Sequence, residues 1–200
     1  MHEPQDPRAG PSRRQLLVAS AALALGGAVG SCGGSKPKTV TTISTAQADN
    51  DAAILGTLLD QENSSIAAYT LVATKLRGRP LVEARRFLGH ERRHAAALAA
   101  AIRSLGSTPD PPQPRTEYEA GFPRLRGARD ALSFALDVET TAVAAYSDAI
   151  GKIATDDVRA TAAAILVTES EHAAVALGEL GRPQVPEAFV TGAPPEASTP

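Results

Sequence analysis

The sequence has no tryptophan, a single cysteine and only 4% aromatic residues. A β-sandwich would need more aromatic and β-branched residues, whereas the abundant alanine favours closely packed helices. One cysteine cannot form a disulfide within the chain, which excludes a disulfide-stabilised scaffold. An excess of positive charge is also missing, since 20 basic residues face 22 acidic ones, and nucleic acid is therefore not an expected partner. The composition predicts one all-α domain with tails.

The N-terminal region has a different character from the rest of the chain. Residues 12–17, SRRQLL, resemble a twin-arginine export signal, and the apolar run over 16–29 is too short to span a bilayer permanently. The run ends at residues 29–32, VGSC, which resemble a bacterial lipobox with Cys32 as the lipidation site. We predict a signal peptide over 1–32 and an exported, extracytoplasmic lipoprotein anchored to the membrane. Simple secretion and an uncleaved anchor are the alternatives.

Apolar residues follow a helical 3,4 spacing in four segments further along the chain. These segments are about 50–77, 81–105, 132–153 and 158–180. Short connections make the first and second helices one antiparallel hairpin, and the third and fourth another. The connection over 106–128 is long enough to return along the bundle, so the second and third helices can run parallel. We predict a flexible tether over 33–50, a four-helix bundle over 51–182 and a proline-rich tail over 183–200.

Two short patterns occur twice in these helices. A glutamate is followed two turns later by a tyrosine in the first and third helices, and the second and fourth helices carry Glu-x-x-His. The first pattern is formed by Glu62 and Tyr69 and by Glu139 and Tyr146, and the second by Glu91 and His94 and by Glu169 and His172. In both hairpins the Glu-x-x-His pair follows the first glutamate by about 30 residues. The repetition predicts that two copies of one hairpin form a shared site.

The four repeated glutamates all lie on apolar stripes of their helices. An unpaired carboxylate there would be costly to ionise, so something must compensate its charge. Two divalent cations would balance four carboxylates, and two neutral imidazoles would complete the ligand set. Glu and His three residues apart share one helix face and can reach the same ion.

These motifs resemble the ferritin-like di-iron carboxylate superfamily, with bacterioferritin-like repeats, in which a bundle of two hairpins joined by a long crossover holds two metal ions. The resemblance implies two iron ions per chain, or manganese as the alternative. It also implies a reaction with oxygen or peroxide, by ferroxidase or oxidant-removing activity, with Fe(II) as a possible substrate. A non-catalytic metal-binding or structural bundle is the other hypothesis. A homodimer is left open.

The resemblance also assigns roles to individual residues. It implies six metal ligands, with Glu62, Glu91 and His94 around one ion and the remaining three around the other, some of the glutamates bridging. The remaining three are Glu139, Glu169 and His172. Tyr69 and Tyr146 are the candidate catalytic residues, placed to hydrogen-bond ligating carboxylates. Their alternative role is that of ordinary core tyrosines at heptad spacing.

Two further features of the second helix have competing interpretations. His90, Glu91 and His94 match the His-Glu-x-x-His zinc motif of metalloproteases. However, His90 lies about 100° around the helix from Glu91, and its counterpart in the second copy is Thr168. We therefore expect His90 to be solvated and no protease site to form. The same helix carries the arginine pairs at 85–86 and 92–93, which could meet acidic residues or an anionic surface, or simply be solvated.

Overall fold

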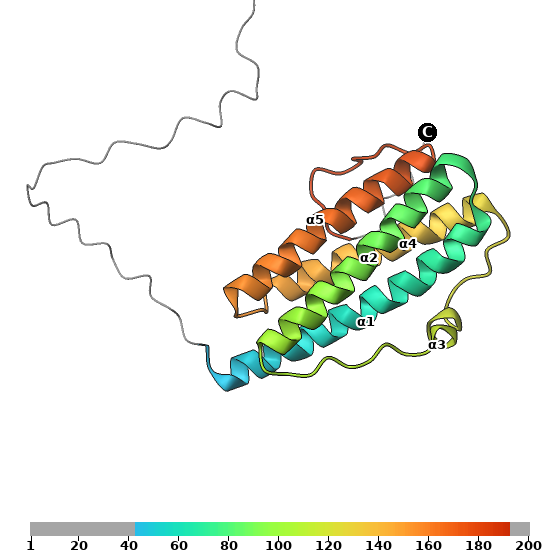
Figure 1. Cartoon of the computed structure of the whole chain (residues 1–200). Coiled ribbons are helices and arrows are strands. Elements are labelled where there is room, and N and C mark those ends of the chain that lie inside the picture. The colour runs from blue at the N-terminus through green and yellow to red at the C-terminus, as the bar shows by residue number, and fades with distance from the viewer. Residues whose placement is uncertain (1–42, 193–200) are drawn as a thin grey trace, which may run out of the picture. The chain divides into compact units, whose positions relative to one another are not determined.

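The computed structural model of this protein describes residues 43–192, which form four long helices and one short helix (Figure 1). The helices are α1 Thr45–Lys75, α2 Gly78–Ser104, α3 Arg115–Glu119, α4 Ala128–Ile150 and α5 Asp156–Glu179. No strand occurs between residues 43 and 192, which confirms the all-α fold. Within the same residues, no helix combines the length and the apolar character needed to cross a bilayer. The predicted signal peptide and Cys32 lie outside the described residues.

The first helix begins at Thr45, ahead of the boundary predicted at residue 50. Ser44 and Gln47 cause the early start, because they form a reciprocal capping box. The Gln47 backbone N–H donates to Ser44 Oγ at 3.3 Å, and the Ser44 N–H donates to Gln47 Oε1 at 2.9 Å. Both hydrogen bonds satisfy backbone or side-chain groups that would otherwise lack partners at the helix end.

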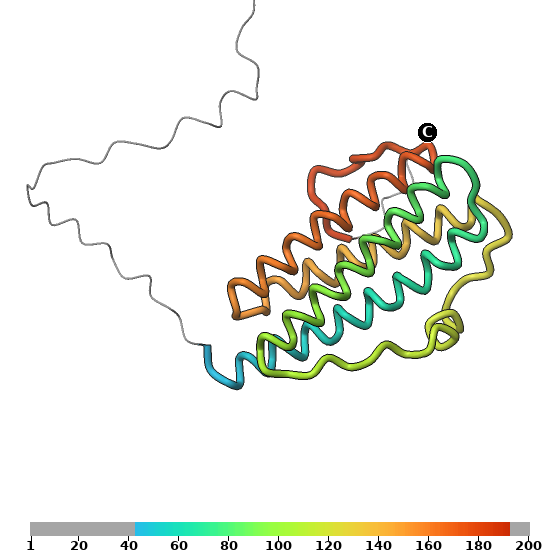
Figure 2. Tube along the Cα trace, in the orientation of Figure 1, coloured from blue at the N-terminus to red at the C-terminus, as the bar shows by residue number. Residues whose placement is uncertain are grey.

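The chain path follows the predicted topology. α1 packs mainly against α2, and α4 against α5, while α1 also contacts α4. The crossover from α2 runs along the bundle before α4 begins, so α2 and α4 run in the same direction (Figures 1 and 2). The two antiparallel hairpins joined by a long crossover are therefore present. Gly78, with φ at +59°, lies at the tight turn between α1 and α2, where the left-handed region favours glycine.

The short helix α3 was not predicted from the sequence. It lies against α1, where the Tyr118 hydroxyl donates to Asp60 Oδ1 at 2.7 Å and accepts the Gln113 N–H at 3.2 Å. Five residues are too few to show a helical period, which is why the pattern of apolar residues did not reveal it.

Asp51 links α1 to the turn between α4 and α5 by hydrogen bonds. Its carboxylate accepts the backbone N–H groups of Ala154 and Thr155 at 2.9 and 2.8 Å. Burial raises the pKa of this carboxyl, but the polar groups of Thr155 and Ala154 and the charge of Arg159 outweigh burial and hold the pKa below its ordinary value. Asp51 is therefore ionised in the folded protein and supports the start of α5.

The hydrophobic core has two main parts, separated by a polar layer. One part contains Leu55, Leu98, Ala149 and Ile165 from the four long helices. The other part contains, among others, Val72, Leu76, Phe87, Leu125 and Phe134. Between them, at the same level on each long helix, lies one buried glutamate. This layer is where the repeated motifs meet.

Candidate metal centre

Each long helix contributes one glutamate to the polar layer, and each of these side chains is 1% exposed or less. They are Glu62 on α1, Glu91 on α2, Glu139 on α4 and Glu169 on α5. One turn further along α2 and α5 lie His94 and His172, with 11% and 3% of their side chains exposed. Four carboxyl groups inside one bundle are expensive to ionise unless cations or hydrogen-bond donors compensate them.

The six side chains form two overlapping groups, each able to surround a metal ion. Glu62, Glu91, His94 and Glu169 offer ligand atoms within 4.8 Å of one another, and so do Glu91, Glu139, Glu169 and His172. Glu91 and Glu169 belong to both groups. The structure thus brings all six predicted residues together, and it places these two glutamates between the two positions.

Several ligand-type atoms of the cluster are buried without a hydrogen bond from any described residue. Both carboxylate oxygens of Glu169 and one atom in each of five further residues have no hydrogen bond of regular geometry, although Glu169 Oε1 lies within ion-pair distance of His94 Nδ1, at 2.7 Å. These atoms are Glu62 Oε2, Glu91 Oε1, Glu139 Oε2, His94 Nδ1 and His172 Nδ1. Buried polar atoms are rarely left unpaired in folded proteins. Carboxylate oxygens and imidazole nitrogens are also the donors that iron and manganese accept, so the cluster fits a di-iron site.

The pKa values of the four carboxyl groups are raised in one pair and lowered in the other. Burial raises the pKa of Glu62 and of Glu139 above the ordinary range for a glutamate. Burial acts in the same direction on Glu91 and Glu169, but interactions with the two histidines outweigh it and lower the pKa of both. The two glutamates shared by both groups are therefore the ones most readily ionised.

The same carboxylates raise the pKa values of the two histidines. Burial by itself would lower the pKa of His94, but Glu169, Glu62 and Glu91 raise it to about 12. His172 likewise reaches about 11, because its neighbouring carboxylates outweigh burial. Two imidazolium groups can thus balance two carboxylates while the other two carboxyls stay protonated. Two divalent cations would instead balance four carboxylates beside neutral imidazoles, so both arrangements are electrically neutral.

The two tyrosines hold the glutamates of the opposite hairpin. The Tyr69 hydroxyl on α1 donates to Glu139 Oε1 on α4, and the Tyr146 hydroxyl on α4 donates to Glu62 Oε1 on α1. In each of these glutamates the other oxygen, Oε2, has no hydrogen bond from a described residue. Each tyrosine therefore occupies one carboxylate oxygen and leaves the second directed into the cluster, which confirms the predicted contact between tyrosine and carboxylate.

The expectation that His90 is a solvated residue is wrong. His90 is only partly exposed, and its Nδ1 lies 2.9 Å from Nε2 of His172, with the two rings stacked at 19°. Although His90 lies about 100° around the helix from Glu91, it is only about 40° from His94, on the side facing α5. The conclusion against a zinc protease is unaffected, because His90 contacts a histidine and belongs to neither ligand group.

The surroundings of the two histidines differ. The ring of Phe87 stacks on His172 with centroids 3.9 Å apart. His90 Nδ1 lies within hydrogen-bond distance of Nε2 of His172. By the repeat, the counterpart of His90 near His94 is Thr168, whose hydroxyl donates to the Ala164 carbonyl of its own helix. The contacts of Phe87 and His90 with His172 were not predicted from the sequence, because both residues occur in only one of the two copies.

Known structures share the fold described here. A ferritin-like, diiron-carboxylate protein of Bacillus anthracis strain Ames matches with a TM-score of 0.59 and 20% identity, covering 69% of this chain and 99% of that chain. A conserved hypothetical protein of Mycobacterium tuberculosis gives the same TM-score and identity, covering 66% and 98%. No curated protein matches the chain. The model of a family described as ferritin-like domain matches residues 50–182, most of the chain, and the protein therefore belongs to the ferritin-like domain family.

Proposed function

We propose that this protein binds two iron ions in the polar layer of the bundle, with manganese as the alternative metal, and reacts with oxygen or peroxide. The observation that carries the proposal is the pair of overlapping ligand groups, in which Glu91 and Glu169 serve both positions. Glu62 and His94 complete one position. Glu139 and His172 complete the other. The buried oxygens and nitrogens of these residues that have no hydrogen bond among the described residues support the same assignment.

The chain's own residues position and protect such a centre. Tyr69 and Tyr146 fix Glu139 and Glu62 by hydrogen bonds, so each of these carboxylates presents one oxygen. The apolar clusters on both sides of the layer restrict access of water. When bound, two Fe(II) ions supply two electrons, which with two protons suffice to reduce one hydrogen peroxide to two waters.

We also propose that the protein works outside the cytoplasmic membrane. The twin-arginine motif over 12–17 and the lipobox over 29–32 support export and anchoring through Cys32. The twin-arginine route carries folded proteins, so a bundle could receive its metal before export.

Fe(II) oxidation tests the proposed activity. The purified protein, given Fe(II) and then peroxide or air, should oxidise it faster than buffer does, and Glu91→Ala and Glu169→Ala should abolish the excess rate. Glu171→Ala is the matched control, because Glu171 lies on α5 with an exposed side chain and outside both ligand groups. Metal binding without any excess rate would instead favour the alternative, a non-catalytic metal-binding bundle.

A further inference from the structure

The outer face of α2 carries a concentration of arginine. The helix contains six arginines, but only two glutamates, and one of these, Glu91, is buried in the metal centre. Arg79 and Arg86 have ion-pair partners in Glu179 and Glu83. The other four have exposed side chains and no ion pair or hydrogen bond with any residue in 43–192. They are Arg85, Arg92, Arg93 and Arg103.

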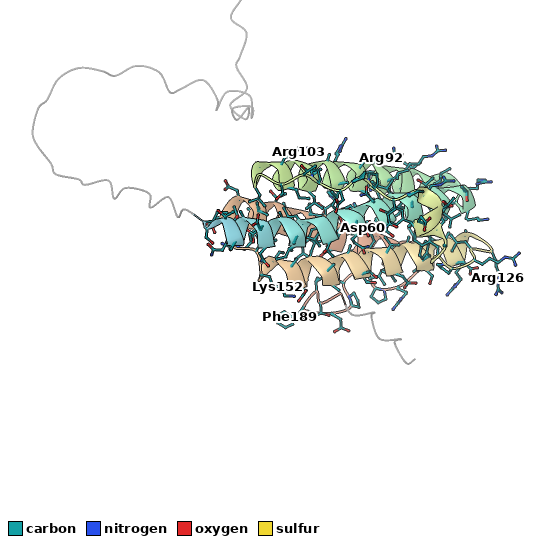
Figure 3. The ribbon with its side chains drawn as sticks, turned by 90° about the horizontal axis from the view of Figure 1, so that it is seen from below. Asp60, Arg92, Arg103, Arg126, Lys152 and Phe189 are labelled. Carbon is teal, nitrogen blue, oxygen red and sulfur yellow. The ribbon has the colours of Figure 1, made fainter. Side chains whose placement is uncertain are left out.

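Three of these arginines form a row along the helix. At 100° per residue, Arg85, Arg92 and Arg103 lie within about 20° of one line, which at 1.5 Å per residue is about 27 Å long. Arg93 lies about 80–100° further around the helix. In Figure 3, Arg92 and Arg103 occupy one edge of the bundle, whereas Lys152 and Phe189 lie at the opposite edge and Arg126 at one end. We call the exposed side of α2 formed by Arg85, Arg92, Arg93 and Arg103 the arginine face.

We propose that the arginine face docks on an anionic phospholipid surface. A guanidinium group can donate two parallel hydrogen bonds to the oxygens of one phosphate, and it stays charged at any physiological pH. A row of unpaired arginines about 27 Å long complements a flat, negatively charged surface over several headgroups. The inference does not depend on the metal centre.

The composition of the face favours a lipid surface over a protein partner. Between this row and Arg93 lie the small residues Gly89, Ala96 and Ala100, which let the helix approach a flat surface closely. Hot spots of protein interfaces are rich in Trp and Tyr as well as Arg, and they lie in well-packed pockets from which water is excluded. Val82 is the only large apolar side chain that α2, described in full, exposes. The arginine face therefore has charge but little apolar anchoring.

The length of chain before α1 is compatible with this placement. If Cys32 is the lipid anchor, the chain from Cys32 to Ser44 reaches at most about 40 Å, so the bundle must stay close to the membrane. The start of α1 and the end of α2 lie at the same end of the first hairpin (Figure 1), so a bundle tethered there can lie along the surface on α2. The inner face of α2, with Glu91, would then be about one helix diameter, or 10 Å, from the headgroups.

A footprinting experiment on the full chain tests the docking directly. The chain is mixed with vesicles of phosphatidylcholine alone or with added phosphatidylglycerol, and arginines are modified with phenylglyoxal and located by mass spectrometry. The anionic vesicles should protect Arg85, Arg92 and Arg103, while Arg126 and Arg129, exposed elsewhere on the bundle, stay reactive. Raising NaCl from about 0.1 to 1 M shortens the Debye length from about 10 to 3 Å and should remove the protection.

Matched variants separate the face from the rest of the chain. Arg85→Gln, Arg92→Gln and Arg103→Gln combined should weaken vesicle binding by up to about 100-fold, since each basic residue near an anionic surface contributes about fivefold. The control combines Arg124→Gln, Arg126→Gln and Arg129→Gln, which removes the same charge and keeps the leader, and it should bind like the wild type.

Three results would overturn the proposal. The first is equal reactivity of the α2 arginines with neutral and anionic vesicles. The second is equal loss of binding in both triple variants. The third is protection by soluble poly-glutamate in the absence of protection by vesicles, which would point to an acidic protein partner.

Discussion

Removing the His90 imidazole should weaken one of the two metal positions and leave the other unchanged. A histidine that offers Nδ1 to a metal carries its proton on Nε2, and in His172 that nitrogen faces His90 Nδ1 at 2.9 Å. His90 then accepts this hydrogen bond and fixes both the tautomer and the orientation of His172. In His90→Ala the ring of His172 keeps its contact with Phe87 but loses the hydrogen bond at its Nε2.

The expected loss can be estimated from comparable sites. Removing a hydrogen-bond partner of a ligating histidine usually costs about 10- to 100-fold in metal affinity, which corresponds to about 1.4–2.7 kcal/mol. Only the group that contains Glu139 and His172 should be affected, because His94 has no hydrogen bond with a second histidine among residues 43–192. His90→Asn should recover part of the loss, since its amide oxygen can still accept a hydrogen bond.

An anaerobic titration with Fe(II) or Co(II) against a competing chelator measures the affinities of the first and the second metal equivalent separately. Thr168→Ala is the matched control, because Thr168 is the counterpart of His90 in the second hairpin and bonds only its own helix. The reasoning fails if His90→Ala weakens both equivalents to the same degree. It also fails if His90→Ala and Thr168→Ala behave alike.

Two further predictions concern stability. Tyr69→Phe leaves an oxygen of the buried Glu139 without its donor, so the metal-free protein should lose about 1–3 kcal/mol, or at least about 2 °C in Tm; an equal or larger drop for Tyr118→Phe, whose bond to Asp60 is exposed, would contradict this. Asp51→Asn should cost about 1.5–3 kcal/mol at pH 7 by urea unfolding. Because the folded pKa of Asp51 is depressed, its contribution is full above the unfolded pKa of about 3.9 and is lost as the pH falls through the folded pKa. The difference between variant and wild type should therefore shrink below pH 3.8, and a constant difference would argue against the assignment.

Much of the fold and the six clustered residues could be predicted because the sequence repeats itself. A buried glutamate on an apolar stripe is unusual, and four of them at matching positions in two hairpins define one level of the bundle. The helical period sets which face each glutamate occupies, and the short turns fix how the helices of each hairpin meet. The length of the crossover was sufficient to predict that α2 and α4 are parallel.

Other features depend on contacts between helices, which a single helix period cannot reveal. The sequence placed Tyr69 and Tyr146 near carboxylates but did not show that each bonds the glutamate of the other hairpin. The role of Glu91 and Glu169 in both groups likewise depends on how α2 and α5 approach each other. The contact of His90 with His172 was not predicted, because His90 has no counterpart histidine in the second hairpin and its place against α5 depends on how the two hairpins pack.

The most direct test of the metal centre is the metal content of the protein. After anaerobic loading with Fe(II) and removal of free metal, the wild type should retain about two ions per chain, as the two overlapping groups require. Glu91→Ala and Glu169→Ala should lose both ions, because each glutamate serves both groups, whereas Glu171→Ala should retain them. A wild type that binds neither iron nor manganese, or retention that is the same in all three variants, would contradict the account.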